Sequence, residues 1–149
     1  SDLDANVEVL DLNDFEMPLF SVDKEKTDGI PDAAHDFYKK IGDADGLLVS
    51  FAEHNGNYTA AYKNLFDWTS RIDAKVYQGK PAVLLSTSPG GRGGQNVMAA
   101  ATGSAPHFAM DVQASLSVPS FYDNFDMANG AISNQEIQSE LESVLAAFG

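Results

Sequence analysis

Two short polar stretches contain the residues of this 149-residue chain that are best suited to chemistry. The first, 53–56, reads Glu-His-Asn-Gly and follows the apolar run 47–51. The second, 86–94, combines hydroxyl side chains, glycines and one arginine, and it follows the apolar run 81–85. Amide and hydroxyl groups can hydrogen-bond the edge of a flat polar ligand, and glycines let the backbone approach it closely. We interpret the two stretches as two walls of one binding site.

The strands that must position these stretches are indicated by their hydrophobic patterns. The runs 47–51 and 80–86 are short and apolar, which is typical of buried strands in parallel sheets. Alternating residues predict a strand near a sheet edge over 6–12 and a strand exposed on one face over 112–118. The segment 13–29 has no clean period and contains Pro18, so we expect a long surface loop there.

Helices are expected between and after these strands. Pro31 can open a helix whose apolar stripe runs from Ala34 to Ile41. Further helices are predicted from about 59 to 71 and from 95 to about 102, and Ser133 to Glu136 reads as a capping box before a last helix. The alternation of strands and helices predicts one α/β domain over 1–149, a parallel sheet with helices on both faces. Ligands of such sheets bind beyond the carboxyl ends of the strands.

Composition excludes several classes of function. The formal net charge of −13 disfavours nucleic acid as a partner, since it repels phosphate backbones. The absence of cysteine excludes disulfides, thiolate zinc sites and cysteine nucleophiles. No apolar run approaches the ~20 residues of a membrane helix. The three histidines share no ligand spacing, so we predict no metal site. Neither a Walker loop nor a Gly-x-Ser-x-Gly elbow is present.

Several motifs in a fixed order resemble those of the NADPH-dependent FMN reductase family over about 7–125. Members carry a Pro-Glu-Tyr-Asn-Gly loop followed by a helix with Leu-Lys-Asn-x-x-Asp-Trp, and this chain has Glu53-His54-Asn55-Gly56 followed by Lys63-Asn64-Leu65-Phe66-Asp67-Trp68. The segments 11–12 and 17–19, Lys80-Pro81 and the turn from Ser86 to Gly94 match as well. The resemblance implies a flavodoxin-like fold with strand order 2-1-3-4-5.

The resemblance also implies an NAD(P)H-dependent reductase that passes electrons through FMN to flavin, quinone, azo or similar acceptors. Because the cofactors carry the reaction, the protein needs only to bind, orient and tune them, and we assign no general acid or base. We expect a cytoplasmic homodimer or homotetramer that acts on a small molecule and has neither nucleic acid nor membrane as partner. The residues expected to bind FMN or the NADPH (or NADH) phosphate are Glu53, His54, Asn55, Gly56, Ser86, Thr87, Ser88, Gly90, Gly91 and Arg92.

Four positions depart from the family pattern. The family proline is Ala52 here, the family tyrosine is His54, and the Pro-Gly before the helix is Thr59-Ala60. An imidazole changes its charge near neutral pH, which predicts a more pH-sensitive reduction of FMN than in a relative with tyrosine. The spread of Tyr62, Phe66 and Trp68 around their helix is an independent argument for a homo-oligomer, because one chain is not expected to bury all three.

The largest departure concerns the start of the chain. The family begins with a strand, a phosphate loop rich in glycine and serine, and a helix, which together take roughly 30 residues. We expect a sequence that is a fragment of a longer protein, with 1–5 as the end of the missing helix. The alternative is a shortened domain that pairs the strands near Val7 and Leu47 directly and binds the FMN phosphate poorly. A non-catalytic flavin-binding protein or electron carrier, and a domain whose site has decayed, are the alternative functions.

Overall fold

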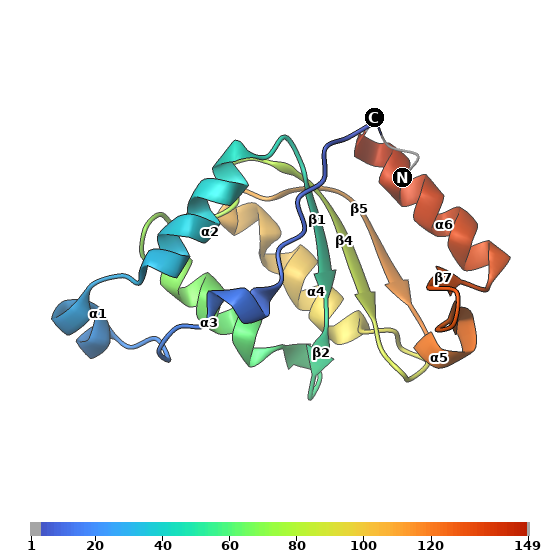
Figure 1. Cartoon of the computed structure of the whole chain (residues 1–149), viewed down its shortest axis with the longest axis horizontal. Helices are drawn as coiled ribbons and strands as arrows, with labels where there is room; N and C mark the ends of the chain where they lie inside the picture. Colours follow the sequence, from blue (N-terminus) through green and yellow to red (C-terminus); the bar gives the residue numbers. More distant parts are fainter. Residues whose placement is uncertain (1–3, 149) are drawn as a thin grey trace.

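A computed structural model describes residues 4–148 and contains one three-stranded parallel sheet (Figure 1). Its strands are β1 (Leu47–Phe51), β4 (Pro81–Thr87) and β5 (Asp111–Val118), in the order β1-β4-β5. β4 pairs in parallel with both neighbours. The three strands predicted from the apolar runs and from the alternation over 112–118 are confirmed, and the parallel sheet with them.

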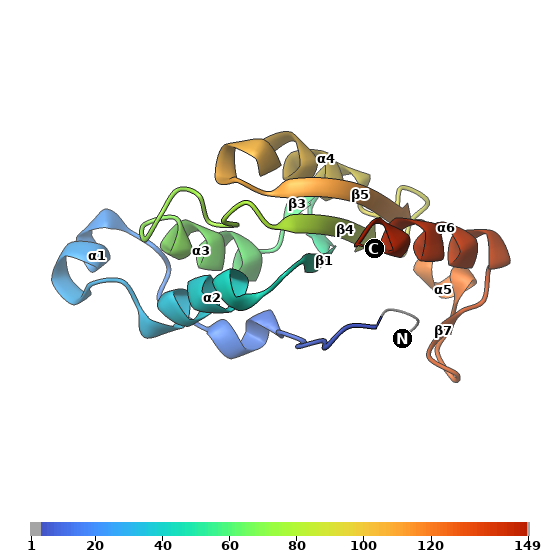
Figure 2. The ribbon, with the colours of Figure 1, turned by 90° about the horizontal axis from the view of Figure 1, so that it is seen from above.

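The central strand β4 is covered on both faces. Val83 and Leu84 point to opposite sides of the sheet, and both are fully buried, as the continuous apolar run predicted. Helices α4 (Gln95–Ser104) and α6 (Gln135–Leu145) lie on opposite sides of β5 (Figure 2). On the α4 side, Val97 and Met98 belong to the same buried cluster as Leu84. The fold therefore has three layers, helix, sheet and helix.

Helices α2 (Asp32–Asp43) and α3 (Ala60–Thr69) pack against each other beside β1. Ala34 and Ile41, at the two ends of the predicted stripe of α2, are buried. Behind α3 a column of aromatic rings continues into the segment that leads to β4, with Tyr62, Phe66 and Tyr77 stacked in succession. The short 3-10 helix η2 (Ala105–Phe108) closes this column, because Phe108 meets Phe66 edge to face at 4.7 Å between ring centroids.

The strand predicted over 6–12 is wrong. Residues 4–11 run extended without strand pairing, and Leu12–Phe15 form the 3-10 helix η1. Val7 and Val9, whose alternation suggested a strand, are 66% and 86% exposed. β1 does not pair with this segment, so the predicted alternative of a sheet closed by direct pairing is also wrong. A strand requires a neighbour for its backbone hydrogen bonds, and alternation alone supplies none.

Two further predictions at the amino-terminal side need correction. The segment 13–29 is not a continuous loop, because α1 (Val22–Asp28) lies within it and is capped by the hydroxyl of Ser21. β1 was predicted to be buried, but it forms an edge of the sheet and is exposed on one face, where Leu48 is 52% exposed. The predicted helix end over 1–5 lies partly outside the described residues, and 4–5 are not helical.

The chain ends with short elements that follow β5. They are α5 (Phe121–Asn124), the strand pair β6 (Phe125–Asp126) and β7 (Ala131–Ile132), helix α6 and the 3-10 helix η3 (Ala146–Phe148). The predicted last helix is confirmed, but its capping box is not. Asn134, not Ser133, caps α6, and its side-chain oxygen accepts from the backbone N–H groups of Glu136 and Ile137.

The aromatic residues of α3 pack within a single chain, contrary to the argument made from their spacing. Trp68 is 1% exposed, meets Phe20 edge to face and donates from Nε1 to the carbonyl of Pro18 at 2.7 Å. Tyr62 and Phe66 are half-buried in the aromatic column. The extended segment before α1 supplies the cover that the helix pattern could not reveal. Within 4–148 no helix has the length and apolar character required to cross a membrane.

Candidate functional site

The two polar stretches lie at the same edge of the sheet, as predicted. β1 and β4 are parallel neighbours, and Phe51 at the end of β1 is paired with Ser86 near the end of β4. The backbone leaves the sheet at its carboxyl edge after each of these strands, and Figure 1 shows β2 there, below β1 and beside the turn that follows β4. This is the edge at which α/β sheets bind their ligands.

The first stretch forms a tight hairpin. β2 (Glu53–His54) pairs with β3 (Asn57–Tyr58), and Asn55 and Gly56 form the two-residue turn with φ values of 52° and 75°. Two successive positive φ angles indicate a type I′ turn, and Asn-Gly is the dipeptide that most favours it. His54, Asn55 and Gly56 are exposed, so the tip of the hairpin is free to contact a ligand.

The second stretch is a turn held by its own hydroxyl groups. Ser86 is 2% exposed, donates to the carbonyl of Gly93 at 2.8 Å and is hydrogen-bonded to the hydroxyl of Ser117. Thr87 donates to the carbonyl of Val118 at 2.8 Å, and Ser88 to that of Gly90 at 3.3 Å. Each of the three predicted hydroxyl contacts thus shapes the turn here. The half-buried hydroxyls of Thr87 and Ser88 still have acceptor capacity for a ligand. The Ser86 side chain is buried and serves the turn, so its predicted contact with a ligand needs correction.

The glycines of this turn fall into two kinds. Gly93 has φ +59° and Gly94 has φ +79°; a Cβ at Gly93 would lie 2.8 Å from the backbone carbonyl of Val118. Gly93 thus permits the close approach of the turn to β5, and Gly94, whose Cβ would lie 3.0 Å from that of Ser86, permits its approach to β4. Gly90 and Gly91 have open space where a side chain would be. They form the exposed surface of the turn, which is where a ligand could rest directly on the backbone.

The hairpin and the turn are tied together at the start of α4. The carboxylate of Glu53 accepts a hydrogen bond from the backbone N–H of Val97 at 2.9 Å. A Cβ on Gly56 would lie 3.2 Å from Nδ2 of Asn96, so the tip of the hairpin also approaches α4. Arg92, predicted to meet a nucleotide phosphate, is exposed and donates from Nη2 to the side-chain oxygen of Asn96 at 2.8 Å.

A third segment, which the sequence analysis missed, adjoins the turn. The backbone N–H of Ser120 donates to the carbonyl of Gly90 at 2.9 Å, and that of Phe121 donates to the carbonyl of Ser88 at 3.0 Å. The segment follows β5, so its place at this edge could have been expected from the parallel strand order. Asn96 was missed as well, and no signal in its surroundings distinguishes it from an ordinary polar residue of a helix.

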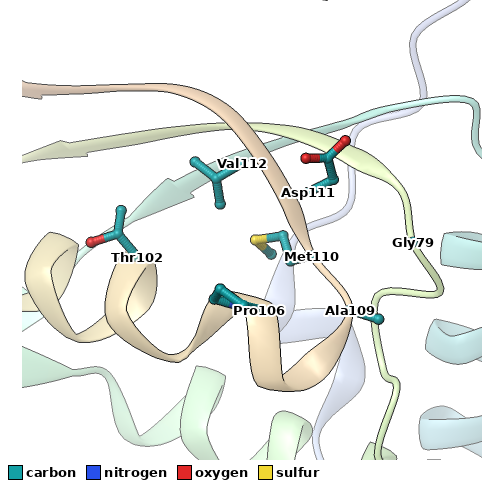
Figure 3. A pocket seen from close by; sticks show the side chains of 7 residues that line it. All are labelled: Gly79, Thr102, Pro106, Ala109, Met110, Asp111 and Val112. Atoms are coloured by element: carbon teal, nitrogen blue, oxygen red, sulfur yellow. The ribbon is translucent and has the colours of Figure 1, made fainter.

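Two hollows in the described part of the chain lie elsewhere. One, of about 390 Å³, is lined by the start of β5 and the segment before it, and Figure 3 shows Met110 and Val112 at its wall. Because β5 begins there, this hollow is at the amino edge of the sheet, opposite the two polar stretches. The other, of about 340 Å³, lies between α3 and α4 among the aromatic rings, with Tyr58 at its margin.

Comparison with known proteins identifies the family of this chain. The sequence profile of the family described as NADPH-dependent FMN reductase matches residues 1–123. The chain belongs to this family. The motifs that suggested the resemblance lie within that range, among them both polar stretches.

Two curated relatives of this FMN reductase family member are quinone reductases. A 2-hydroxy-1,4-benzoquinone reductase from a Burkholderia species is 38% identical over 78 residues, which is 52% of this chain and 42% of the relative. An NADPH:quinone oxidoreductase from Arabidopsis thaliana is 34% identical over 90 residues, 60% of this chain and 44% of the relative. The chain thus spans less than half the length of these curated relatives.

A solved structure shows the same fold. FerB from Paracoccus denitrificans, a flavoenzyme NAD(P)H:(acceptor) oxidoreductase, matches with a TM-score of 0.71. The match covers 92% of this chain and 74% of FerB, at 23% sequence identity. The predicted flavodoxin-like fold is confirmed by this similarity and by the parallel sheet between helices.

Proposed function

We propose that this protein is an NAD(P)H-dependent reductase that uses FMN to reduce quinones, flavins, azo compounds or similar small molecules. Its membership of the FMN reductase family supports the cofactors, and the names of its quinone reductase relatives support the class of acceptor. The observation that carries the proposal is the meeting of the hairpin 53–58 and the turn 86–94 at one carboxyl edge of the sheet.

The residues at this edge fit the flavin ring better than they fit the phosphate. The exposed backbone of His54, Asn55 and Gly56 offers donors and acceptors to a ring edge, and the open surface of Gly90 and Gly91 admits a flat group. Among the residues of this edge, Arg92 is the one that could meet the phosphate by charge, and it is already bonded to Asn96. The first N–H groups of α4 are no alternative, because the Glu53 carboxylate is bonded there and would repel a phosphate.

The chemistry divides between cofactor and protein. Bound FMN would supply hydride acceptance from the nicotinamide and electron transfer to the acceptor. The chain's own task is to hold the hairpin 53–58 and the turn 86–94 at a fixed separation, so that the flavin ring fits between them. The hairpin 53–58 is rigid because Asn55 and Gly56 suit the conformation at its tip. The turn 86–94 is rigid because its hydroxyl groups bond to its own backbone and to β5.

We also propose a homodimer or homotetramer located in the cytoplasm, without nucleic acid as a partner. The net charge of −13 supports the last point, because it disfavours the approach of a polyanion. Light scattering on the purified protein tests the assembly. A mass of twice or four times 16.0 kDa is expected. A monomeric mass that does not change with protein concentration would rule the oligomer out.

A titration with FMN, followed by turnover with NADPH and a quinone, tests the function. Binding should quench flavin fluorescence and shift the visible flavin spectrum. With FMN in catalytic amount and oxygen excluded, continuous oxidation of NADPH should then require the quinone. Binding without NADPH oxidation would favour the electron-carrier alternative. A protein that binds no FMN would disprove the proposal. Gly91→Trp fills the open surface of the turn, so it should weaken FMN binding with little effect on stability.

A further inference from the structure

Helix α4 lacks a capping side chain of its own. Its N-cap residue is Gly94, which has a left-handed backbone and offers no side-chain acceptor to the first N–H groups of the helix. An N-cap side chain normally accepts from the N–H two or three residues further on. Val97 is the third residue after Gly94, and its N–H is instead bonded to the Glu53 carboxylate at 2.9 Å.

The cap therefore comes from the other wall of the site. Glu53 lies on β2, 44 positions before Val97, and its strand partner is Tyr58. A carboxylate suits the place, because a helix N-terminus carries a partial positive charge. The close approach of Gly56 to Asn96 shows that the hairpin tip also lies against α4, so the contact does not depend on one bond alone.

We propose that the Glu53 side chain is a positioning residue that fixes the separation between the hairpin and the glycine turn, and thereby the width of the flavin site. The inference rests on the proposed function, which supplies the ligand. It assigns to the Glu53 side chain a role in shaping the site, in place of direct contact with the flavin. Gly94 cannot be exchanged for a self-capping serine without strain, because its φ is +79° and a Cβ there would crowd Ser86 at 3.0 Å. The start of α4 thus depends on an acceptor from another element, and β2 supplies it.

Two substitutions separate positioning from mere stability. Glu53→Ala removes the acceptor, whereas Glu53→Gln keeps an oxygen that can accept from Val97. The matched control is Thr59→Ala, because Thr59 caps α3 within its own segment by accepting from the N–H of Tyr62 at 3.1 Å. Both alanine variants should lose similar stability, since each removes one helix cap. Only Glu53→Ala should alter the site.

Amide hydrogen exchange at Val97 reports whether the hydrogen bond to Glu53 is present, and FMN titration reports its effect on the site. In Glu53→Ala the Val97 amide should exchange at least about tenfold faster, and the FMN dissociation constant should rise about fivefold or more, within the range of a lost cap. The visible circular dichroism of bound FMN should change as well. Glu53→Gln should restore all three quantities, and Thr59→Ala should leave FMN affinity and the dichroism as in the wild type.

Each outcome decides the inference. An unchanged exchange rate of the Val97 amide in Glu53→Ala would show that Glu53 does not hold this N–H. Faster exchange with unchanged FMN affinity would overturn the positioning role. Equal loss of FMN affinity in Thr59→Ala would reduce Glu53 to a general stabiliser. If the wild type binds no FMN, the proposed function fails and the positioning role with it. The exchange of Val97 then still tells whether the hairpin and α4 are linked.

Discussion

His54 lies next to the Asn-Gly turn of the hairpin, where the family motif has a tyrosine, and it is exposed. An imidazole changes its charge between about pH 5 and 8, whereas a phenol stays neutral there. A cationic His54 beside the flavin would favour the anionic reduced form and so raise the midpoint potential at low pH.

We therefore predict that the midpoint potential of bound FMN falls more steeply with pH in the wild type than in His54→Tyr. The extra slope should approach about 30 mV per pH unit, the value for one additional proton in a two-electron couple. A spectroelectrochemical titration across this pH range measures it. His107→Tyr changes an exposed histidine of η2 and should leave the profile unaltered. Identical profiles for the wild type and His54→Tyr would remove His54 from the site.

Gly93 and Gly103 allow opposite predictions for the same substitution. Gly93 has a positive φ, and a Cβ would meet the Val118 carbonyl at 2.8 Å, so Gly93→Ala should cost at least about 2 kcal/mol of unfolding free energy. Gly103 lies in α4 with open space around it, so Gly103→Ala should add about 0.5 kcal/mol. Urea unfolding followed by circular dichroism measures both. Equal effects of the two changes would show that the turn is not packed against β5 in solution.

At the scale of elements, α3 holds the extended segment before α1 through two side chains. Asn64 accepts from the N–H of Phe20 at 2.9 Å and donates to the carbonyl of Pro18 at 3.1 Å, and Trp68 donates to the same carbonyl. The lysine-asparagine and aspartate-tryptophan pairs of the family motif thus have distinct tasks. Lys63 and Asp67 form an ion pair along the helix, whereas Asn64 and Trp68 bind another segment.

Asn64→Ala should release this segment. We expect a loss of about 1–3 kcal/mol, because polar backbone groups of the segment lose their partner, and faster cleavage by a nonspecific protease within 16–21. Lys63→Ala is the neighbouring control. It removes only the ion pair with Asp67, in which the lysine side chain is 57% exposed, and should cost less than about 1 kcal/mol. Unchanged proteolysis in Asn64→Ala would show that the segment is held by packing alone.

Two tyrosines, the half-buried Tyr62 and the buried Tyr77, link α3 to the segment before β4 and predict the response to alkaline pH. Burial raises the pKa of Tyr62, with Tyr77 nearby as a further cause, and burial also raises the pKa of Tyr77. Their hydroxyls are hydrogen-bonded to each other. Both phenols stay protonated in the folded protein after those of the unfolded chain begin to ionise near about pH 10. Their contribution to stability is complete below that pH and is lost as the pH rises.

Above about pH 10 the unfolding free energy should fall by as much as about 2.7 kcal/mol per pH unit from these two groups, since the unfolded state releases two protons that the folded state retains. Urea unfolding at several alkaline pH values measures the slope. The double variant Tyr62→Phe and Tyr77→Phe should have a correspondingly shallower slope. A double variant with the wild-type slope would indicate that the two phenols ionise in the folded protein.

How far the sequence could predict the fold depended on how local each signal was. The runs 47–51 and 80–86 predicted strands because their own residues are apolar. Asn-Gly at 55–56 is likewise a local signal, in this case for the hairpin that the structure contains. The alternation at Val7 and Val9 misled, because a strand also needs a partner. The placing of the site at one sheet edge followed from parallel order. The hydrogen bond from the Val97 N–H to the Glu53 side chain could not be predicted, since the two residues are 44 positions apart and no local pattern pairs them.

At the scale of the whole molecule, the exposed apolar side chains bear on the assembly. The argument for an oligomer from the aromatic residues of α3 no longer holds, because one chain packs them. The proposed oligomer must therefore use other surfaces. Large apolar side chains are exposed on several segments of the described chain, on the extended segment 4–11, on β1 and in the region after β5. Substitutions at such positions tell whether anything covers them in solution.

Val9 and Val83 provide a matched pair for that test. Val9 is 86% exposed on the extended segment, so Val9→Asp should change the unfolding free energy by no more than about 0.5 kcal/mol. Val83 is fully buried in β4, so even the milder Val83→Ala should cost about 2 kcal/mol. Urea unfolding at several protein concentrations measures both. A loss above about 2 kcal/mol in Val9→Asp would be the signature of a buried surface. If that loss disappeared on dilution, the segment would belong to an interface between subunits, because dissociation exposes it.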